Sequence, residues 1–142
     1  MKVHYMSQSD NWSTPQEFYN RLDSIYHFDL DAAASSSNKK CDKWYGLDHP
    51  DPDRRDGLSV DWDGDVVWLN PPYGRVIGHW LKKAHEESSN RTVVLLLPAR
   101  TDTHWFHNYC TPHRITFLRG RLKFGDAIHA APFPSMIVEM IK

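Results

Sequence analysis

Residues 65–75 read DVVWLNPPYGR, an apolar run that predicts a β-strand and an Asn-Pro-Pro-Tyr turn directly after it. Proline cannot donate a hydrogen bond to a neighbouring strand, so two adjacent prolines end this strand at Asn70. The turn is stiff because each proline ring restricts the backbone. The sequence therefore predicts a strand whose carboxyl end presents Asn70 and Tyr73 on a rigid turn.

Two elements are predicted before this turn. Residues 13–28 (STPQEFYNRLDSIYHF) predict a helix that Ser13 or Thr14 caps and that starts with Pro15. Its apolar residues recur at helical spacing and predict one buried stripe, formed by Phe18, Leu22 and Ile25. Residues 28–38 (FDLDAAASSSN) then predict a short strand that runs into a loop of small residues.

Further helices and strands alternate after the turn. Residues 74–88 predict a helix that buries four apolar side chains, those of Ile77, Trp80, Leu81 and Ala84. Residues 92–100 (TVVLLLPAR) are a continuous apolar run, typical of a strand buried on both faces of a parallel sheet. Residues 101–110 predict a short helix capped by Thr101 or Asp102. Three strand-like pieces end the chain, at residues 114–120, 121–125 and 135–141.

This order of elements indicates a three-layer α/β fold with a mostly parallel sheet and antiparallel C-terminal strands at its edge. In open sheets of this kind, ligands bind at the carboxyl ends of the strands. Two such ends are unusual in composition, residues 29–35 (DLDAAAS) and residues 68–74 (WLNPPYG). The 142 residues suit one domain, 1–142, with no internal repeat and no separate target-recognition domain.

Composition excludes some classes of protein. The net charge of −1 indicates no overall affinity for nucleic acid, although residues 48–65 are acid-rich and residues 114–123 carry four cations and no acid. No apolar stretch is long enough to span a membrane and no signal-peptide core is present, so we expect a cytoplasmic protein. The two cysteines, Cys41 and Cys110, are expected to be free thiols.

The Asn-Pro-Pro-Tyr turn is either a turn stiffened for stability or a site for one kind of chemistry. The exocyclic amine of a nucleobase is a poor nucleophile, because its lone pair is delocalised into the ring. If both N–H groups donate to fixed acceptors, the lone pair becomes available. Asn70 offers its side-chain carbonyl and Pro71 a backbone carbonyl, both preorganised for developing positive charge. Tyr73 can stack on the face of an extruded base.

Seven blocks of the chain, from about residue 12 to residue 135, occur in the order typical of one family: WSTPQEFYNRL, FDLDAAAS, DGLSVDW, VVWLNPPYGR, LLLPARTDTHWF, FLRGRLKFG and APFPS. The chain resembles the phage N-6-adenine DNA methyltransferases, the small Dam-like family. The resemblance implies a Rossmann-like methyltransferase fold and S-adenosylmethionine as the cofactor. It also implies base flipping and transfer of a methyl group to the 6-amino group of adenine in double-stranded DNA, with Asn70, Pro71, Pro72 and Tyr73 as the catalytic residues.

The resemblance also implies residues that bind the cofactor. Asp31 and Ala32, with Asp29 nearby, are expected at its methionine end, although their loop lacks the usual glycines and is alternatively a plain loop or helix start. Thr14 and Pro15 are expected to fold over the methionine moiety. For the cofactor's adenine amine the acceptor is expected to be Asp56, and for the ribose hydroxyls Asp42 and Asp48 are candidates by position alone.

Cations near the turn are candidates for contacts with DNA phosphates. Arg119, Arg121 and Lys123 alternate along a predicted strand and therefore share one face, which is otherwise a solvated surface. Arg75 follows the turn directly. We expect no metal site, because the His-x-x-His-x-x-Cys pattern of residues 104–110 lacks zinc spacing.

Two alternatives to adenine methylation stay open at this stage. The same motif can serve methylation of another nitrogen, in a cytosine amine, RNA or a protein glutamine. The glycine-free loop also permits a methyltransferase-like module that binds DNA without catalysis. Any recognition of a DNA sequence is expected to be short or loose and to depend on residues 39–55.

Overall fold

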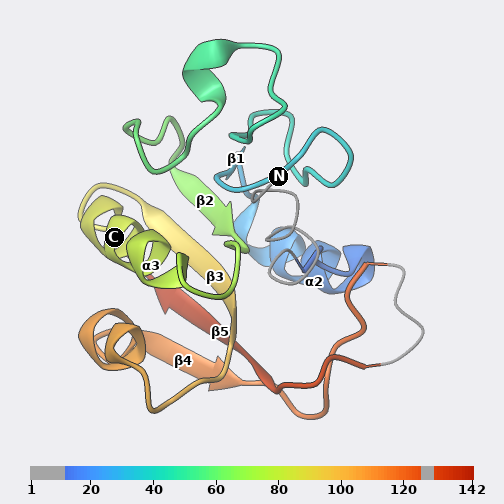
Figure 1. The fold of residues 1–142 in the computed structure, drawn as a ribbon, viewed down its shortest axis with the longest axis vertical. Coiled ribbons are helices and arrows are strands. Elements are labelled where there is room, and N and C mark those ends of the chain that lie inside the picture. Colours follow the sequence, from blue (N-terminus) through green and yellow to red (C-terminus); the bar gives the residue numbers. More distant parts are fainter. Residues whose placement is uncertain (1–11, 126–129) are drawn as a thin grey trace.

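The structure is a computed structural model that describes residues 12–125 and 130–142 (Figure 1). A mixed set of helices and strands forms one α/β unit. In chain order the elements are α2 (Gln16–Tyr26), β1 (Leu30–Asp31), the 3₁₀ turn η1 (Pro52–Arg54), β2 (Val66–Leu69), α3 (Ile77–Glu87), β3 (Thr92–Pro98), the π-helical turn η2 (Phe106–Cys110), β4 (Arg114–Phe117) and β5 (Ser135–Met140).

The five strands form one sheet in the order β1-β2-β3-β5-β4. The pairs β1–β2 and β2–β3 are parallel, and β5 is antiparallel to both β3 and β4. The prediction of a mostly parallel sheet with an antiparallel C-terminal strand is therefore confirmed. The C-terminal strands also form one edge of the sheet, as predicted: β4 is the largely exposed edge strand, and the almost wholly buried β5 lies between β3 and β4.

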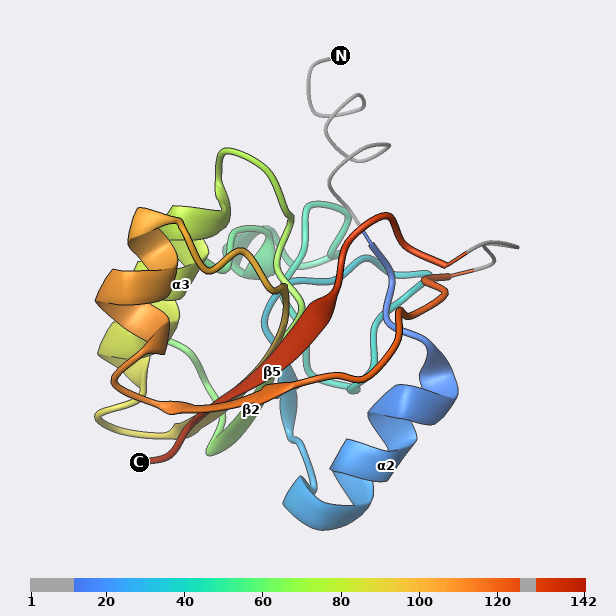
Figure 2. The ribbon, with the colours of Figure 1, turned by 90° about the horizontal axis from the view of Figure 1, so that it is seen from below.

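Helices lie on both sides of the sheet, with α2 on one side and α3 and η2 on the other (Figure 2). All four apolar residues predicted to face inward on α3 are buried. On α2, the ring of Tyr19 packs 5.4 Å from that of Trp68, and Tyr19 is the one buried residue of this helix. The predicted stripe is wrong at Ile25, which is 71% exposed, because the buried face is centred on Tyr19.

Local caps differ from those predicted. Pro15 occupies the N-cap position of α2, and neither Ser13 nor Thr14 caps the helix with its side chain. At the start of the helical segment that leads into η2, the hydroxyl of Thr103 accepts a hydrogen bond from the Phe106 amide at 3.2 Å. The predicted cap by Thr101 or Asp102 is therefore wrong by one or two residues.

The strand predicted at residues 121–125 is absent. After β4 the amide of Leu118 still donates to the Ser135 carbonyl, but Gly120 then adopts a positive φ of 73° and the chain leaves the sheet. A left-handed residue interrupts strand geometry, so residues 118–125 form a loop. We call residues 118–125 the basic loop.

The core is continuous across the sheet and both helical layers. The predicted strand at residues 92–100 is confirmed, since β3 is buried from Val93 to Pro98. Cys41 and Cys110 are free thiols, as predicted. Within the described ranges, no helix has the length and apolarity that crossing a membrane requires. The segment between β1 and β2 consists of turns, with one isolated bridge between Asp31 and Trp44.

Candidate active site

The Asn-Pro-Pro-Tyr turn lies at the carboxyl end of β2, as predicted from the sequence. The strand ends at Leu69, and residues 70–73 belong to no helix or strand. Because β1 and β3 run parallel to β2, their carboxyl ends lie at the same edge of the sheet. Side chains from several loops therefore meet at this edge.

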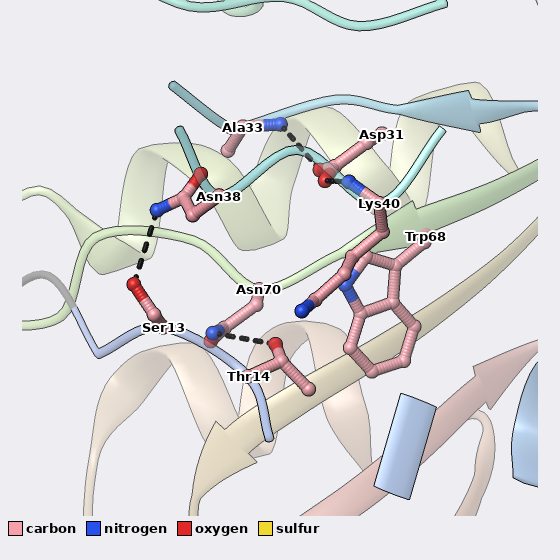
Figure 3. A pocket seen from close by; sticks show the side chains of 8 residues that line it. All are labelled: Ser13, Thr14, Asp31, Ala33, Asn38, Lys40, Trp68 and Asn70. Atoms are coloured by element: carbon pink, nitrogen blue, oxygen red, sulfur yellow. Dashed lines mark hydrogen bonds between the residues drawn. The ribbon is translucent and has the colours of Figure 1, made fainter. Parts of the chain in front are cut away.

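The amide of Asn70 has one satisfied end and one unsatisfied end. Its Nδ2 donates to the hydroxyl of Thr14 at 3.0 Å (Figure 3) and also to the carbonyl oxygen of Trp12. Its Oδ1 is buried, and no described residue donates a hydrogen bond to it. A buried acceptor without a donor is costly, and native proteins rarely keep one without a function or a bound partner. The turn thus offers one acceptor that fits an N–H group of a ligand.

Tyr73 is placed differently from the exposed ring that stacking on a base requires. Its side chain is 2% exposed, and its hydroxyl donates to the carbonyl of Leu96 at 3.2 Å. Phe124 and Phe133 pack edge-on against the ring, with centroids 6.4 and 5.7 Å away. Burial raises the pKa of the Tyr73 phenol well above its ordinary value. In this conformation the ring belongs to the core.

A large pocket of about 470 Å³ opens beside the turn. Asn70, Pro72 and Val76 form its wall on the side of the turn. The loop after β1 and the turns between β1 and β2 supply apolar, acidic and basic groups, together with one residue of α3: Ala33, Ala34, Ser35, Tyr45, Gly46, Leu47, Asp48, Arg55, Asp56, Gly57, Leu58 and Trp80. The pocket thus combines apolar walls with a few polar groups, as ligand pockets usually do.

A narrow pocket adjoins the large one and shares Ala33 and Asn70 with it (Figure 3). Its volume of about 10 Å³ admits one group of the size of a water molecule. Opposite charges line it, since the carboxylate of Asp31 and the side chain of Lys40 both contribute. The other lining residues are Ser13, Thr14, Asn38 and Trp68.

Asp31 is a buried acid at the end of β1. Its carboxylate accepts hydrogen bonds from the backbone amides of Lys40 at 3.0 Å and Ala33 at 3.4 Å. Burial outweighs these bonds and raises the pKa of Asp31 to about 7. Burial also lowers the pKa of the Lys40 ammonium, whose Nζ donates to the side chain of Gln16 at 2.8 Å. Strongly shifted acids in pockets are typical of functional sites.

We expect the burial of Asp31 to make the protein less stable as the pH rises from about 4 to about 7. The folded-state pKa of about 7 lies above the ordinary 3.8, so the folded state holds an extra proton in this window and loses that advantage as the pH rises. The variant Asp31→Asn lacks this titration. As the pH rises through this window, the free energy of unfolding of the variant should therefore increase relative to that of the wild type by an amount on the order of 1 kcal/mol per pH unit.

Urea unfolding of both proteins across this pH range measures the effect. The two proteins differ at this side chain alone, so the difference between the two curves reports the titration of Asp31 together with its electrostatic coupling to Lys40. A difference that does not change with pH would show that burial does not raise the pKa of Asp31.

Two glycines that were not among the predicted site residues allow the backbone to approach residues 32–34, which we call the alanine loop. A Cβ atom on Gly46 would lie 1.9 Å from the carbonyl oxygen of Ala34, and one on Gly57 would lie 2.4 Å from that of Ala32. The loop after β1 has no glycine of its own. The close contact between backbone segments is possible instead because the facing segments carry Gly46 and Gly57. The WYGLD and RDGLS stretches of the sequence were the available signal.

The structure brings only part of the predicted cofactor set to the pockets. Thr14 and Asp31 line the narrow pocket, and Asp56 lines the large one. The carboxylate of Asp56 also accepts hydrogen bonds from the Leu58 amide at 2.9 Å and the Ser59 hydroxyl at 2.5 Å.

Three other predicted residues lie outside both pockets. The carboxylate of Asp29 accepts hydrogen bonds from the amides of Asp65 and Val66, where β2 begins. Ala32 is fully buried, and its amide donates to the Trp68 carbonyl. Pro15 starts α2. Of the three alanines after β1, Ala33 and Ala34 line the large pocket.

Asp42 and Asp48 were the two candidates to bind the ribose hydroxyls of the cofactor, and their positions in the structure favour Asp48. Asp48 lines the large pocket, whereas Asp42 does not. The carboxylate of Asp48 accepts hydrogen bonds from the Ser36 amide at 3.0 and 3.2 Å and from the Ser36 hydroxyl at 2.6 Å. These bonds from Ser36 lower the pKa of Asp48.

The predicted DNA-contacting cations are all exposed. Arg75 follows the turn, and Arg119, Arg121 and Lys123 lie on the basic loop. Although no strand forms there, Phe124 is buried between exposed neighbours. The amide of Gly125 donates to the Ser13 carbonyl at 2.8 Å, so the basic loop lies beside the segment that contacts Asn70.

The histidine and cysteine pattern at residues 104–110 is distributed over separate environments. Cys110 is fully buried, and His107 hydrogen-bonds through Nε2 to the carbonyl of Thr101 at 2.8 Å. In the part of the chain that the structure describes, no three His, Cys, Asp or Glu side chains are grouped to hold a metal ion.

Several known proteins are similar in sequence to this chain. The family model described as DNA N-6-adenine-methyltransferase (Dam) matches residues 3–136. A DNA N-6-adenine-methyltransferase of Escherichia phage T1 is 42% identical over 100 residues, which cover 68% of this chain and 39% of that protein. A DNA N-6-adenine-methyltransferase of Haemophilus phage HP1 is 28% identical over 144 residues, covering 93% of this chain and 79% of that protein. The match to the first relative thus spans well under half of its length.

Proposed function

Since the chain belongs to the DNA N-6-adenine-methyltransferase family, we propose that it transfers a methyl group from S-adenosylmethionine to the 6-amino group of adenine in DNA. One observation carries this proposal: Asn70 Oδ1 is a buried acceptor to which no described residue donates, at the carboxyl end of a parallel strand and on the wall of a large pocket. The parallel strands β1 to β3, with antiparallel β5 between β3 and β4, support a Rossmann-like methyltransferase fold.

The residues of the two pockets fit the methyl donor. S-adenosylmethionine supplies an electrophilic methyl group on a positively charged sulfur. The large pocket has apolar walls at Leu47, Leu58 and Trp80 for an adenosine moiety, with Asp48 and Asp56 as acceptors for hydroxyl or amine hydrogens. Gly46 and Gly57 leave the space that the alanine loop needs beside this pocket.

The ammonium group at the methionine end of the donor fits the narrow pocket. Its opposite charges would complement an α-amino acid, with the carboxylate of Asp31 facing an ammonium and the ammonium of Lys40 facing a carboxylate. The pocket admits one water-sized group, which is the size of an ammonium. Asp31 therefore stays in the proposed cofactor set and Lys40 joins it, while Asp29 and Ala32 lie outside the pockets.

The chain's contribution to the reaction is the activation and placement of the amine. Asn70 Oδ1 accepts one hydrogen of the adenine amine and the Pro71 carbonyl accepts the other. Both acceptors belong to a rigid turn, so they are aligned before the substrate arrives. They stabilise the positive charge that develops on the nitrogen as the methyl group is transferred. The extra proton leaves afterwards, so no general base is required.

Stacking of Tyr73 on an extruded adenine needs one rearrangement. Phe124 and Phe133 pack edge-on against the ring in this conformation. Either the two phenylalanines move off the ring, or the base enters among the three aromatic rings. Phe124 ends the basic loop, so movement of this loop on DNA would uncover Tyr73. The exposed cations Arg75, Arg119, Arg121 and Lys123 are the proposed contacts with phosphates beside the flipped base.

Labelled S-adenosylmethionine and adenine-containing duplex DNA test this function directly. We expect label to enter DNA and, after digestion to nucleosides, to co-elute with N6-methyl-2′-deoxyadenosine, which mass spectrometry identifies. Label on cytosine, or on RNA or protein in parallel reactions, would identify a different nitrogen as the substrate. Binding of DNA without binding of S-adenosylhomocysteine in calorimetry would instead show a non-catalytic module.

A further inference from the structure

The orientation of the Asn70 amide is determined by residues 12–14, which we call the N-terminal strap. Both N–H bonds of Nδ2 have acceptors there: the Thr14 hydroxyl, which Figure 3 shows, and the Trp12 carbonyl. A carbonyl oxygen can only accept, so the amide group that faces Trp12 must be the nitrogen. Rotating the amide by half a turn would place Oδ1 against that carbonyl oxygen. The two bonds therefore hold Oδ1 on the opposite side, away from the strap.

The strap is itself fixed from several directions. Its Ser13 carbonyl accepts from the Gly125 amide at 2.8 Å, and its Ser13 hydroxyl accepts from the Asn38 side chain at 3.1 Å. The Trp12 ring packs edge-on against Phe124 and Phe133, at 5.6 and 5.2 Å between centroids. Thr14 is buried, so its hydroxyl has little freedom to turn toward water. The Trp12 carbonyl and the Thr14 hydroxyl, which orient the Asn70 amide, are thus held by contacts on several sides.

We propose that Thr14 is a positioning residue, whose hydroxyl fixes the Asn70 amide so that Oδ1 is presented to the amine of the substrate. This inference rests on the proposed function and deepens it, because the family resemblance implied a contact between Thr14 and the methyl donor instead. The two roles predict different kinetics. Loss of a contact with the methyl donor weakens binding of the methyl donor. Loss of the hydrogen bond between Thr14 and Asn70 instead slows the chemical step in the fully bound enzyme.

Replacement of Thr14 by valine tests the proposal, because valine has nearly the same shape and lacks the hydroxyl. We expect Thr14→Val to lower kcat by about tenfold to a hundredfold, the effect of a misplaced catalytic group. The Kd for S-adenosylhomocysteine, measured by calorimetry, should stay within about twofold of the wild type. Thr14→Ser keeps the hydroxyl and should restore kcat to within about threefold.

Thr111→Val is the matched control. The hydroxyl of Thr111 donates to the His107 carbonyl at the end of η2 and contacts neither pocket. The control should leave kcat and Kd unchanged. A Thr14→Val enzyme with unchanged kcat and a weakened Kd would overturn the positioning role, and so would a Thr14→Ser enzyme as slow as Thr14→Val.

A spectroscopic readout separates failure of this inference from failure of the proposed function. The side-chain amide protons of Asn70, assigned by their absence in Asn70→Ala, should exchange slowly with water in the wild type and faster in Thr14→Val. If the wild type neither binds S-adenosylhomocysteine nor methylates DNA, the proposed function fails, whatever the exchange rates. If the wild type is active and the exchange rates of the two proteins are equal, the positioning role alone fails.

Discussion

Replacing Asn70 by alanine is expected to slow methyl transfer by about a hundredfold to a thousandfold, the range found when one preorganised polar group of an active site is removed. The variant loses Oδ1, which is buried with no donor among the described residues and which we propose accepts a hydrogen of the substrate amine. Only the Pro71 carbonyl then remains to accept a hydrogen of that amine. Single-turnover transfer of labelled methyl to duplex DNA measures the effect.

The comparison needs a control for general damage, since Asn70 also donates to Trp12 and Thr14. Calorimetry should show that Asn70→Ala still binds S-adenosylhomocysteine, and its thermal midpoint should be close to that of the wild type. Asn90→Ala makes the same chemical change at an exposed residue before β3, at the opposite end of the strands. It should be fully active. Transfer by Asn70→Ala at the rate of Asn90→Ala would remove Asn70 from the mechanism.

The second large effect is expected at Gly46. A Cβ atom there would lie 1.9 Å from the Ala34 carbonyl oxygen and 2.8 Å from its carbon, so two backbone segments would have to separate. Gly46→Ala should destabilise the fold by about 3 kcal/mol, at the upper end of overpacking costs. It should also weaken binding of S-adenosylhomocysteine by at least about tenfold, because Ala34 and Gly46 both line the large pocket. Urea unfolding and calorimetry measure the two effects.

Gly78→Ala is the matched control. This glycine lies in α3, where an added Cβ atom would meet only the Cβ of Trp105 at an ordinary 3.9 Å. Alanine favours a helix over glycine by about 1 kcal/mol, so this variant should be as stable as the wild type or more stable. If Gly46→Ala matches Gly78→Ala in both stability and binding, the close approach between the alanine loop and Gly46 is not required.

Several features of the site followed from local sequence. The end of β2 at Leu69 and the turn after it depend on two prolines, and proline acts on its own backbone whatever surrounds it. The inward face of α3 and the buried run of β3 follow from the spacing of apolar residues. The loop of small residues after β1 was also correctly placed beside a pocket, because carboxyl ends of parallel strands share one edge.

Other features were beyond local reasoning. Asp29 and Asp31 are two residues apart and were both expected in the cofactor set, yet the carboxylate of Asp29 accepts hydrogen bonds from amides where β2 begins, and Asp31 lines the narrow pocket. The basic loop was predicted as a strand from alternating residues, and the positive φ of Gly120 ends the sheet instead.

By itself, the sequence determined most of the helices and strands, the rigid Asn-Pro-Pro-Tyr turn and the family, because periodicity, proline geometry and motif order are properties of contiguous residues. Only the tertiary structure decided which distant groups meet. It brings Thr14 to Asn70 across 56 residues, places Gly46 against Ala34 and buries Tyr73 beneath Phe124 and Phe133. Such contacts depend on how the loops close over the sheet, and packing around a shared core sets that arrangement.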